Sequence, residues 1–205
     1  MSDEITRRRL LELGLALPPV AALAAGTDAL LGTALAGEST LDATPACGDD
    51  DDETPDQTEG PFYTSRTPRR TSLIIAGLTG TRLTLTGRVL TTRCKPVRRA
   101  LLDFWQADSR GRYDNSGFRL RGHQFTDARG RYRLETVVPG LYTGRTRHIH
   151  VKVRAPGNPV LTTQLYFPGE AGNRTDGIFD PALLVRWRRV GARRVASFDF
   201  VLDLT

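Results

Sequence analysis

The sequence predicts an all-β protein, built as an antiparallel β-sandwich or barrel. From residue 81 onward, apolar residues recur at every second position in several short segments, and this spacing places alternate side chains on one face of a strand. Turns that contain glycine or proline separate these segments. After residue 36 no stretch sustains the periodicity of a long amphipathic helix, so either two packed sheets or a closed barrel is expected.

Short segments along the chain carry the strand pattern, and one carries a weak helical pattern. Strands are expected at TRLTLTGRVL (81–90), ALLDFWQAD (100–108), HIHVKVRAPG (148–157), LTTQLYF (161–167) and SFDFVLDL (197–204). The segment GHQFTDARGRYRLETVV (122–138) is expected to hold two strands joined by a turn at 128–130. Only DPALLVRW (180–187) is expected to form one or two helical turns.

The first 36 residues have the three-part plan of an export signal, with a charged start, a moderately apolar middle and the small residues ALA at 34–36. Arg7 and Arg8 within TRRRLL resemble the twin-arginine type of signal. Charged residues and prolines interrupt the apolar run, so it falls short of the roughly 20 residues of a membrane span. We therefore expect residues 1–36 to be removed, and the mature protein to be extracellular or in the cell envelope without a membrane span.

Residues 37–57 are polar, acidic and proline-containing, and we expect a flexible lead-in to a single domain at 58–205. Export to an oxidising compartment would permit a disulfide between the two cysteines, Cys47 and Cys94, which would tie the lead-in to the sheet. Two separate thiols are also compatible with the sequence.

The chain is basic, with 29 lysines and arginines against 23 aspartates and glutamates and a formal net charge of +6. Such a charge raises the question of nucleic-acid binding. The arginines are scattered, with clumps at TPRRT (67–71) and VRWRRVGARRV (185–195), and aromatic residues do not interleave with them as a base-stacking platform requires. We expect a solvated arginine-rich surface and no nucleic-acid partner.

Two of the three histidines, His148 and His150, lie one residue apart in the strand pattern HIHVKV. Alternation places both imidazoles and Lys152 on one face, while the intervening apolar residues enter the core. Two imidazoles side by side can hold one metal ion. Taken alone, the pair is equally compatible with surface or core hydrogen bonding.

The residues around the histidines decide which metal the pair would suit. No carboxylate lies near them in the sequence, so the facial triad of ferrous enzymes is missing, and so is cysteine-rich zinc spacing. Tyr142 lies just upstream, and Tyr113 follows the strand at 100–108. A phenolate is a hard anionic donor, and deprotonating a phenol at neutral pH takes a strong Lewis acid. Two tyrosinates with two neutral histidines therefore suit ferric iron.

Four segments of the chain resemble, in order, segments of the intradiol ring-cleavage dioxygenases. They are TEGPFY (58–63), LLDFWQADSRGRYDN (101–115), RGHQFTDARGRYRLETVVPGLYTGRTRHIHVKV (121–153) and TTQLYFPGE (162–170). That family includes catechol and protocatechuate dioxygenases and a group of exported relatives. The resemblance implies the intradiol type of β-sandwich and an Fe(III) enzyme. Such an enzyme uses O2 to open catechol-type rings between the two hydroxyl-bearing carbons, giving cis,cis-muconate-type products.

The resemblance also implies a role for each matching residue. Tyr113 and His148 would be equatorial iron ligands and Tyr142 and His150 axial ones, with a hydroxide in the fifth place. Arg145 would stabilise charge on the substrate ring, and Gln164 would line the same pocket. The segment that contains Gly60, Pro61 and Phe62 would cover the entrance.

The chain departs from the family pattern at two points. Where members commonly have RPAHIH or RPAHVH, this chain has RTRHIH, which places Arg147 beside His148. Alternation directs Arg147 away from the site, although it could compete with Arg145 for the functional role. The helical dimerisation region of the cytosolic catechol enzymes is not recognisable, which favours the exported branch and leaves the oligomeric state open.

Two other classes of protein are compatible with these residues. One is a catalytically inactive β-sandwich that binds a metal or a carbohydrate, and the other is a non-redox protein with zinc at the histidines. Against the first, all four expected ligands and the Arg145–Gln164 pair are present. Against the second, zinc has little reason to recruit two phenolates.

Overall fold

The computed structural model describes residue 47 and residues 53–204. The predicted export signal at 1–36 and most of the predicted lead-in at 37–57 therefore lie outside the described residues. Within those residues the chain forms strands β1 (Arg82–Thr91), β2 (Leu101–Trp105), β3 (Arg121–Phe125), β4 (Arg131–Val137), β5 (His148–Arg154), β6 (Leu161–Tyr166), β7 (Arg186–Val190), β8 (Arg193–Ser197) and β9 (Phe200–Leu202). Two 3-10 helices, η1 (Ala171–Arg174) and η2 (Pro181–Leu183), lie between β6 and β7.

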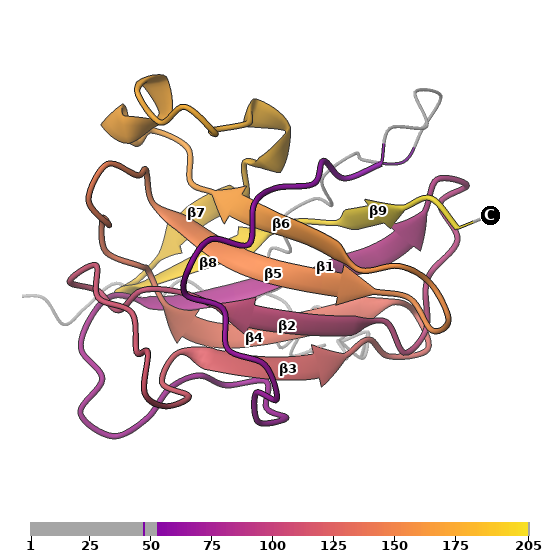
Figure 1. Ribbon diagram of the computed structural model, residues 1–205, viewed down its shortest axis with the longest axis horizontal. Helices are drawn as coiled ribbons and strands as arrows, with labels where there is room; N and C mark the ends of the chain where they lie inside the picture. The colour runs from indigo at the N-terminus through magenta and orange to yellow at the C-terminus, as the bar shows by residue number, and fades with distance from the viewer. Residues whose placement is uncertain (1–46, 48–52, 205) are drawn as a thin grey trace, which may run out of the picture. The chain divides into compact units, whose positions relative to one another are not determined.

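The strands form two sheets, so the predicted all-β sandwich is confirmed (Figure 1). One sheet has the order β3-β2-β5-β6 and is antiparallel throughout. The other has the order β4-β1-β8-β7, with β9 also paired to β1. In this second sheet β1 runs parallel to both β8 and β9, a feature that alternation alone does not predict.

The core between the sheets follows from strand alternation. Ile149, Val151 and Val153 of β5 are fully buried, as are Leu83 and Leu85 of β1. They belong to one hydrophobic cluster that draws on both sheets. Because the apolar side of β5 packs inward, its histidines must face the other side of the sheet.

Strand pairing at two places was not predicted from the sequence. The segment 122–138 contains two strands and the expected turn, in which Gly130 has a φ of +72°. The strands do not pair with each other, because β3 joins the first sheet and β4 the second. The hairpin β7–β8 was not predicted, since its arginines hide the alternation that turns Trp187 and Ala196 toward the core.

The predicted single strand at 197–204 is interrupted, and β1 explains the break. At Gly87 a Cβ atom would lie 1.8 Å from the carbonyl oxygen of Phe198, so β8 and β9 meet against a glycine. The Asp199 carboxylate then accepts the Arg88 amide at 2.7 Å and takes the place of a backbone partner. The side chain of Asp199, rather than its backbone, thus continues the ladder.

Cys47 and Cys94 form a disulfide, with Cα atoms 5.3 Å apart. The bond ties residue 47 to the loop between β1 and β2, as the first of the two sequence alternatives proposed. No helix in the described part of the chain has the length and apolar character needed to cross a membrane.

We expect Gly87→Ala to lower the free energy of unfolding by about 3 kcal/mol, because the added methyl group would overlap backbone that cannot move independently. Gly177→Ala is the matched control, since a Cβ atom there meets nothing within 4 Å and should change stability little. Urea denaturation of both variants measures the difference, and equal stabilities would contradict the account of the β8–β9 break.

Reducing the disulfide should lower the free energy of unfolding by up to about 4 kcal/mol, because the bond closes a long loop in the unfolded chain. Denaturation with and without reductant tests this. Two titratable thiols in the folded, unreduced protein would show that the bond does not form.

Candidate metal centre

The candidate site lies on the face of the β3-β2-β5-β6 sheet that is turned away from the core. Strand register aligns four side chains in one row across this face, in the order Gln164, His150, Trp105 and Arg121. His148 follows one step along β5, opposite Tyr166. Both histidines are buried, because other parts of the chain cover the face.

A segment that we call the strap, residues 54–70, provides much of this cover. It crosses β6, β5, β2 and β3 in front of the sheet (Figure 1). Backbone hydrogen bonds hold it at both edges, from the Gln57 amide to Thr162 and from the His123 amide to Pro68. The middle of the strap is anchored by the row of side chains next to the row that contains His150.

That anchoring row contains Asp103 and Lys152, which are paired in register on β2 and β5. Asp103 accepts hydrogen bonds from the Tyr63 hydroxyl at 3.1 Å and the Thr67 hydroxyl at 2.7 Å. Lys152 forms an ion pair with Glu59 of the strap and lies 4.0 Å from the centre of the Tyr63 ring. The strap is therefore fixed by charge and hydrogen bonds just beyond the site.

The structure brings the four predicted donor residues together. The Tyr113 hydroxyl lies 3.1 Å from His148 Nε2, and the two histidine rings are 4.8 Å apart between centroids. The Tyr113 ring lies 5.8 Å from that of Tyr142 and 6.2 Å from that of His150. Four side chains from β5 and two separate loops thus surround one small volume.

Glycines allow the two tyrosine-bearing loops to touch. At Gly111, two residues before Tyr113, a Cβ atom would lie 1.9 Å from the carbonyl oxygen of Leu141, the residue before Tyr142. At Gly140 a Cβ atom would lie 2.2 Å from the Gly111 amide nitrogen. Any side chain at either position would push the two phenols apart.

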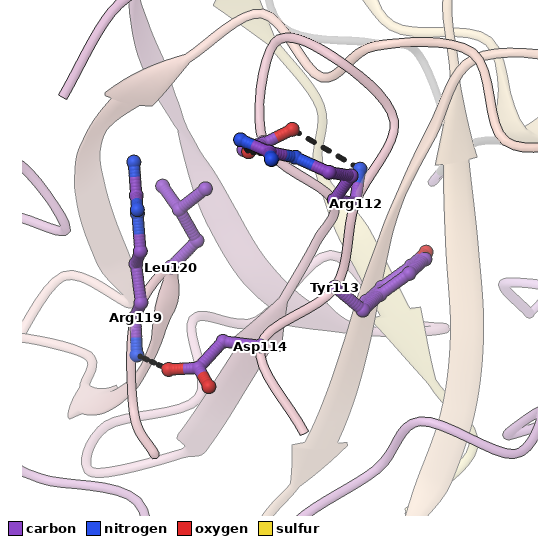
Figure 2. Close-up of a pocket in the computed structure, with 6 residues that line it drawn as sticks. Arg112, Tyr113, Asp114, Arg119 and Leu120 are labelled. Atoms are coloured by element: carbon purple, nitrogen blue, oxygen red, sulfur yellow. Dashed lines mark hydrogen bonds and ion pairs between the residues drawn. The ribbon is translucent and has the colours of Figure 1, made fainter. Parts of the chain in front are cut away.

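A cavity of about 390 Å³ lies behind the Tyr113 loop rather than over the donors. Its lining comes from one stretch of chain, Asp108, Arg112, Tyr113, Asp114, Arg119 and Leu120. In Figure 2 the Tyr113 ring points away from Arg119 and Leu120, and its hydroxyl instead meets His148. The cavity therefore adjoins the Tyr113 loop, while the donor oxygen of Tyr113 faces His148 instead.

Hydrogen bonding and burial set the state of both imidazoles. His148 Nδ1 lies 2.6 Å from the Thr146 carbonyl oxygen and so carries the proton, which leaves the Nε2 lone pair facing Tyr113. Burial lowers the pKa of His148 to about 4, and burial also holds the pKa of His150 well below its ordinary value. Both rings are therefore neutral near pH 7, as metal ligands must be.

The donor set agrees with a ferric ion. Burial raises the pKa of Tyr113, and the nearby Arg145 and Arg121 only partly offset this effect, so a strong Lewis acid is needed to deprotonate the phenol. His150 Nδ1 is buried without a hydrogen-bond partner among the described residues. Over the same residues, no group of three or more His, Cys, Asp or Glu side chains could hold a metal ion. A metal centre here would thus depend on the two phenols, which suit a trivalent ion.

Arg145 and Gln164 lie together, on the same face as His148 and His150. The Arg145 guanidinium donates to Gln164 Oε1 at 2.7 Å, and Gln164 donates in turn to the Thr58 carbonyl of the strap at 3.0 Å. Arg147 forms a different pair with Glu170 at 2.8 Å and also donates to the Pro139 carbonyl. The expectation that Arg147 turns away from the site is confirmed.

Phe62 and Arg121 complete the surroundings of Tyr113. The Phe62 ring stacks on Tyr113 at 4.5 Å and meets the edge of Tyr142 at 5.3 Å. Arg121 is 1% exposed and donates to the carbonyl of Asp114, next to Tyr113, and to that of Phe62. Sequence analysis missed Arg121, because its place beside Trp105 depends on strand register.

Comparisons with known proteins agree with this geometry. A family profile described as Dioxygenase matches residues 58–203, which is more than half of the chain, so the chain belongs to this family of intradiol dioxygenases. It is 38% identical over 118 residues to the protocatechuate 3,4-dioxygenase beta chain of Burkholderia cepacia, covering 49% of this chain and 50% of the relative. It is 28% identical over 178 residues to the chlorocatechol 1,2-dioxygenase of Pseudomonas sp. (strain P51), covering 71% and 68%. The chain spans about half the length of several curated relatives that it matches.

Solved structures share the fold. One is the dioxygenase domain of a dioxygenase carbohydrate-binding protein fusion from the cellulolytic bacterium Streptomyces sp. SirexAA-E. It is 59% identical with a TM-score of 0.74, covering 75% of this chain and 100% of that one. The 3-chlorocatechol 1,2-dioxygenase from Rhodococcus opacus 1CP is 26% identical with a TM-score of 0.71, covering 75% and 73%.

We expect Tyr113→Phe to weaken ferric iron binding by more than the roughly 10–100-fold typical of an outer-shell residue, because it removes a donor atom. The visible tyrosinate-to-iron absorption of the iron-loaded protein should fall with it. Tyr132→Phe is the control, since that hydroxyl donates to the Phe198 carbonyl within the core. Equal iron content and absorption in Tyr113→Phe and wild type would contradict the ligand assignment.

Proposed function

We propose that this protein is an Fe(III) dioxygenase that opens the ring of a catechol-type aromatic between its two hydroxyl-bearing carbons. The observation that carries the proposal is the convergence of Tyr113, Tyr142, His148 and His150, with Arg145 beside them. Bound ferric iron would supply a Lewis acid that takes both oxygens of the substrate and makes its ring reactive toward O2.

The two tyrosines are placed for different tasks. Tyr113 is held by the His148 contact and by the Phe62 stack, which suits a permanent donor. Tyr142 lies on a loop whose neighbours Leu141 and Thr143 are exposed, beside a cavity of about 620 Å³. Tyr142 would accept a substrate hydroxyl proton at its Oη and then move away, because its ring contacts Phe62 and Tyr113 but its hydroxyl makes no hydrogen bond within the described residues.

Arg145 would stabilise the negative charge that develops on the ring as it becomes a ketone. The cation is preorganised by Gln164 and is mostly screened from water, since its side chain is 20% exposed. A single preorganised donor of this kind contributes about 3 kcal/mol to transition-state stabilisation. Gln164 also donates a hydrogen bond to the strap, so it connects Arg145 to the segment that covers the site.

The relatives' names support the class of substrate rather than one compound. Those relatives include enzymes named for protocatechuate, chlorocatechol and hydroxyquinol, which share a 1,2-dihydroxybenzene unit. We propose that shared unit as the recognised group, with O2 as co-substrate and a cis,cis-muconate-type diacid as product. Export through the twin-arginine-type signal would suit a protein that acquires its iron before crossing the membrane, and it is part of the same proposal.

Anaerobic titration of the iron-loaded protein with catechol, protocatechuate and hydroxyquinol tests the function, followed by admission of ¹⁸O-labelled O2. We expect the visible absorption to shift on binding, and a ring-opened diacid that carries label from both atoms of O2 to form. Zinc-loaded protein is the control and should show neither change. A shifted absorption without product would indicate a binding module, and iron-loaded protein without visible absorption would indicate a different metal.

A further inference from the structure

The loop between β6 and β7 contacts Arg145 and Thr146, which lie three and two residues before His148. Asp176 of this loop is 8% exposed, and one of its oxygens, Oδ2, accepts two hydrogen bonds. Arg145 Nε donates at 2.9 Å and the Thr146 amide at 2.8 Å. The other oxygen, Oδ1, accepts the Ile178 amide at 3.2 Å. A single carboxylate thus contacts both the side chain of one residue and the backbone of the next.

Both residues held by Asp176 lead directly to the candidate centre. Arg145 uses its other end to reach Gln164 at 2.7 Å. The Thr146 carbonyl oxygen lies 2.6 Å from His148 Nδ1 and so determines which nitrogen of that ring carries the proton. Asp176 is therefore one contact away from the cation and from the orientation of one donor ring, although it lies 31 residues from Arg145 in the sequence.

Further contacts keep the loop close to Thr146. Asn173 Oδ1 accepts the Thr146 hydroxyl at 2.6 Å. At Gly172 a Cβ atom would lie 3.1 Å from the Thr146 Cα, so the glycine permits this close approach. The Asp176 amide donates to the Gly172 carbonyl at 2.9 Å, which closes the loop on itself. The position of the Asp176 carboxylate is thus set by the loop as well as by Arg145.

The charges explain why an aspartate suits this position. Burial opposes ionisation of Asp176, but the Thr146 and Ile178 amides and the Arg145 guanidinium together hold its pKa below the ordinary value. The carboxylate side chain is 2% exposed and that of Arg145 is 20% exposed. Removing the carboxylate charge would leave Arg145 without this ion-pair partner, and its side chain could then adopt another orientation.

We propose that Asp176 is a positioning residue, which directs Arg145 toward Gln164 and holds the Thr146 carbonyl against His148. It touches neither the substrate nor the donor atoms. Its effect on turnover rests on the proposed function, whereas its effect on the Thr146 backbone does not.

The chain offers a matched control in the neighbouring pair Arg147–Glu170. Arg147 belongs to the same motif and Glu170 to the same loop, but this pair faces away from the centre. Asp176→Asn and Glu170→Gln each remove one carboxylate charge from an arginine partner while keeping the side chain's size. Only the first should affect the centre.

In the iron-loaded protein we expect Asp176→Asn to lower kcat by about 10–100-fold, the range typical of residues that orient an active group. KM should change much less, since Arg145 acts on charge that develops during the reaction. Combined with Arg145→Gln, the Asp176→Asn change should lower kcat by a smaller factor than it does alone, because the part of its effect that acts through Arg145 is already lost. The proposal would be overturned if the two substitutions lowered kcat by the full product of their separate factors, or if kcat were unchanged in Asp176→Asn.

A second measurement does not need activity. In the full-length metal-free protein, Asp176→Asn should speed hydrogen exchange of the Thr146 amide and Glu170→Gln should not. If wild type cleaves no catechol, the proposed function fails while this exchange still tests Asp176. Should Asp176→Asn not fold, Asp176→Glu retains the charge but displaces the carboxylate oxygens. That variant should show the same lower kcat and the same faster exchange of the Thr146 amide. Unchanged exchange in the folded variant would overturn the proposal.

Discussion

Burial of β5 on both of its faces is the constraint on which the rest of the structure depends. One face carries Ile149, Val151 and Val153 into the core, and the other carries His148 and His150. An imidazole removed from water must be neutral and must find partners, so the chain has to bring polar groups to this face. The Tyr113 hydroxyl meets that requirement for His148, whereas His150 stacks on Trp105 and its Nδ1 has no hydrogen-bond partner among the described residues. The strap and the two tyrosine-bearing loops cover this face and complete the candidate centre.

Charge on this face is organised in rows that strand register creates. The row of His150 ends in the buried cation Arg121, whose partners are backbone carbonyls, and the next row pairs Asp103 with Lys152. The first row surrounds the proposed iron ligands, whereas the second holds the strap through Tyr63 and Glu59. The row that contains His150 and the row that holds the strap thus lie next to each other on the same strands, so a change in strand register would disrupt both.

Much of this arrangement could be predicted, because it depends on local spacing. Alternation in HIHVKV predicts the direction of both histidines, and it also predicts that Arg147 turns away from His148. Resemblance to the intradiol enzymes adds Tyr113 and Tyr142, which alternation cannot place. Arg121, Asp103 and Asp176 were missed because their contacts cross strands or loops that are far apart in the chain. The break between β8 and β9 was missed for the same reason, since it depends on the glycine of β1 that Phe198 meets.

We propose that two phenols and two imidazoles of this protein hold one ferric ion. A crystal structure of the iron-loaded protein, with diffraction recorded on both sides of the iron absorption edge, tests it most directly. We expect a single anomalous peak within coordination distance of Tyr113, Tyr142, His148 and His150. A peak elsewhere, or iron held by the histidines with both tyrosines turned away, would contradict it.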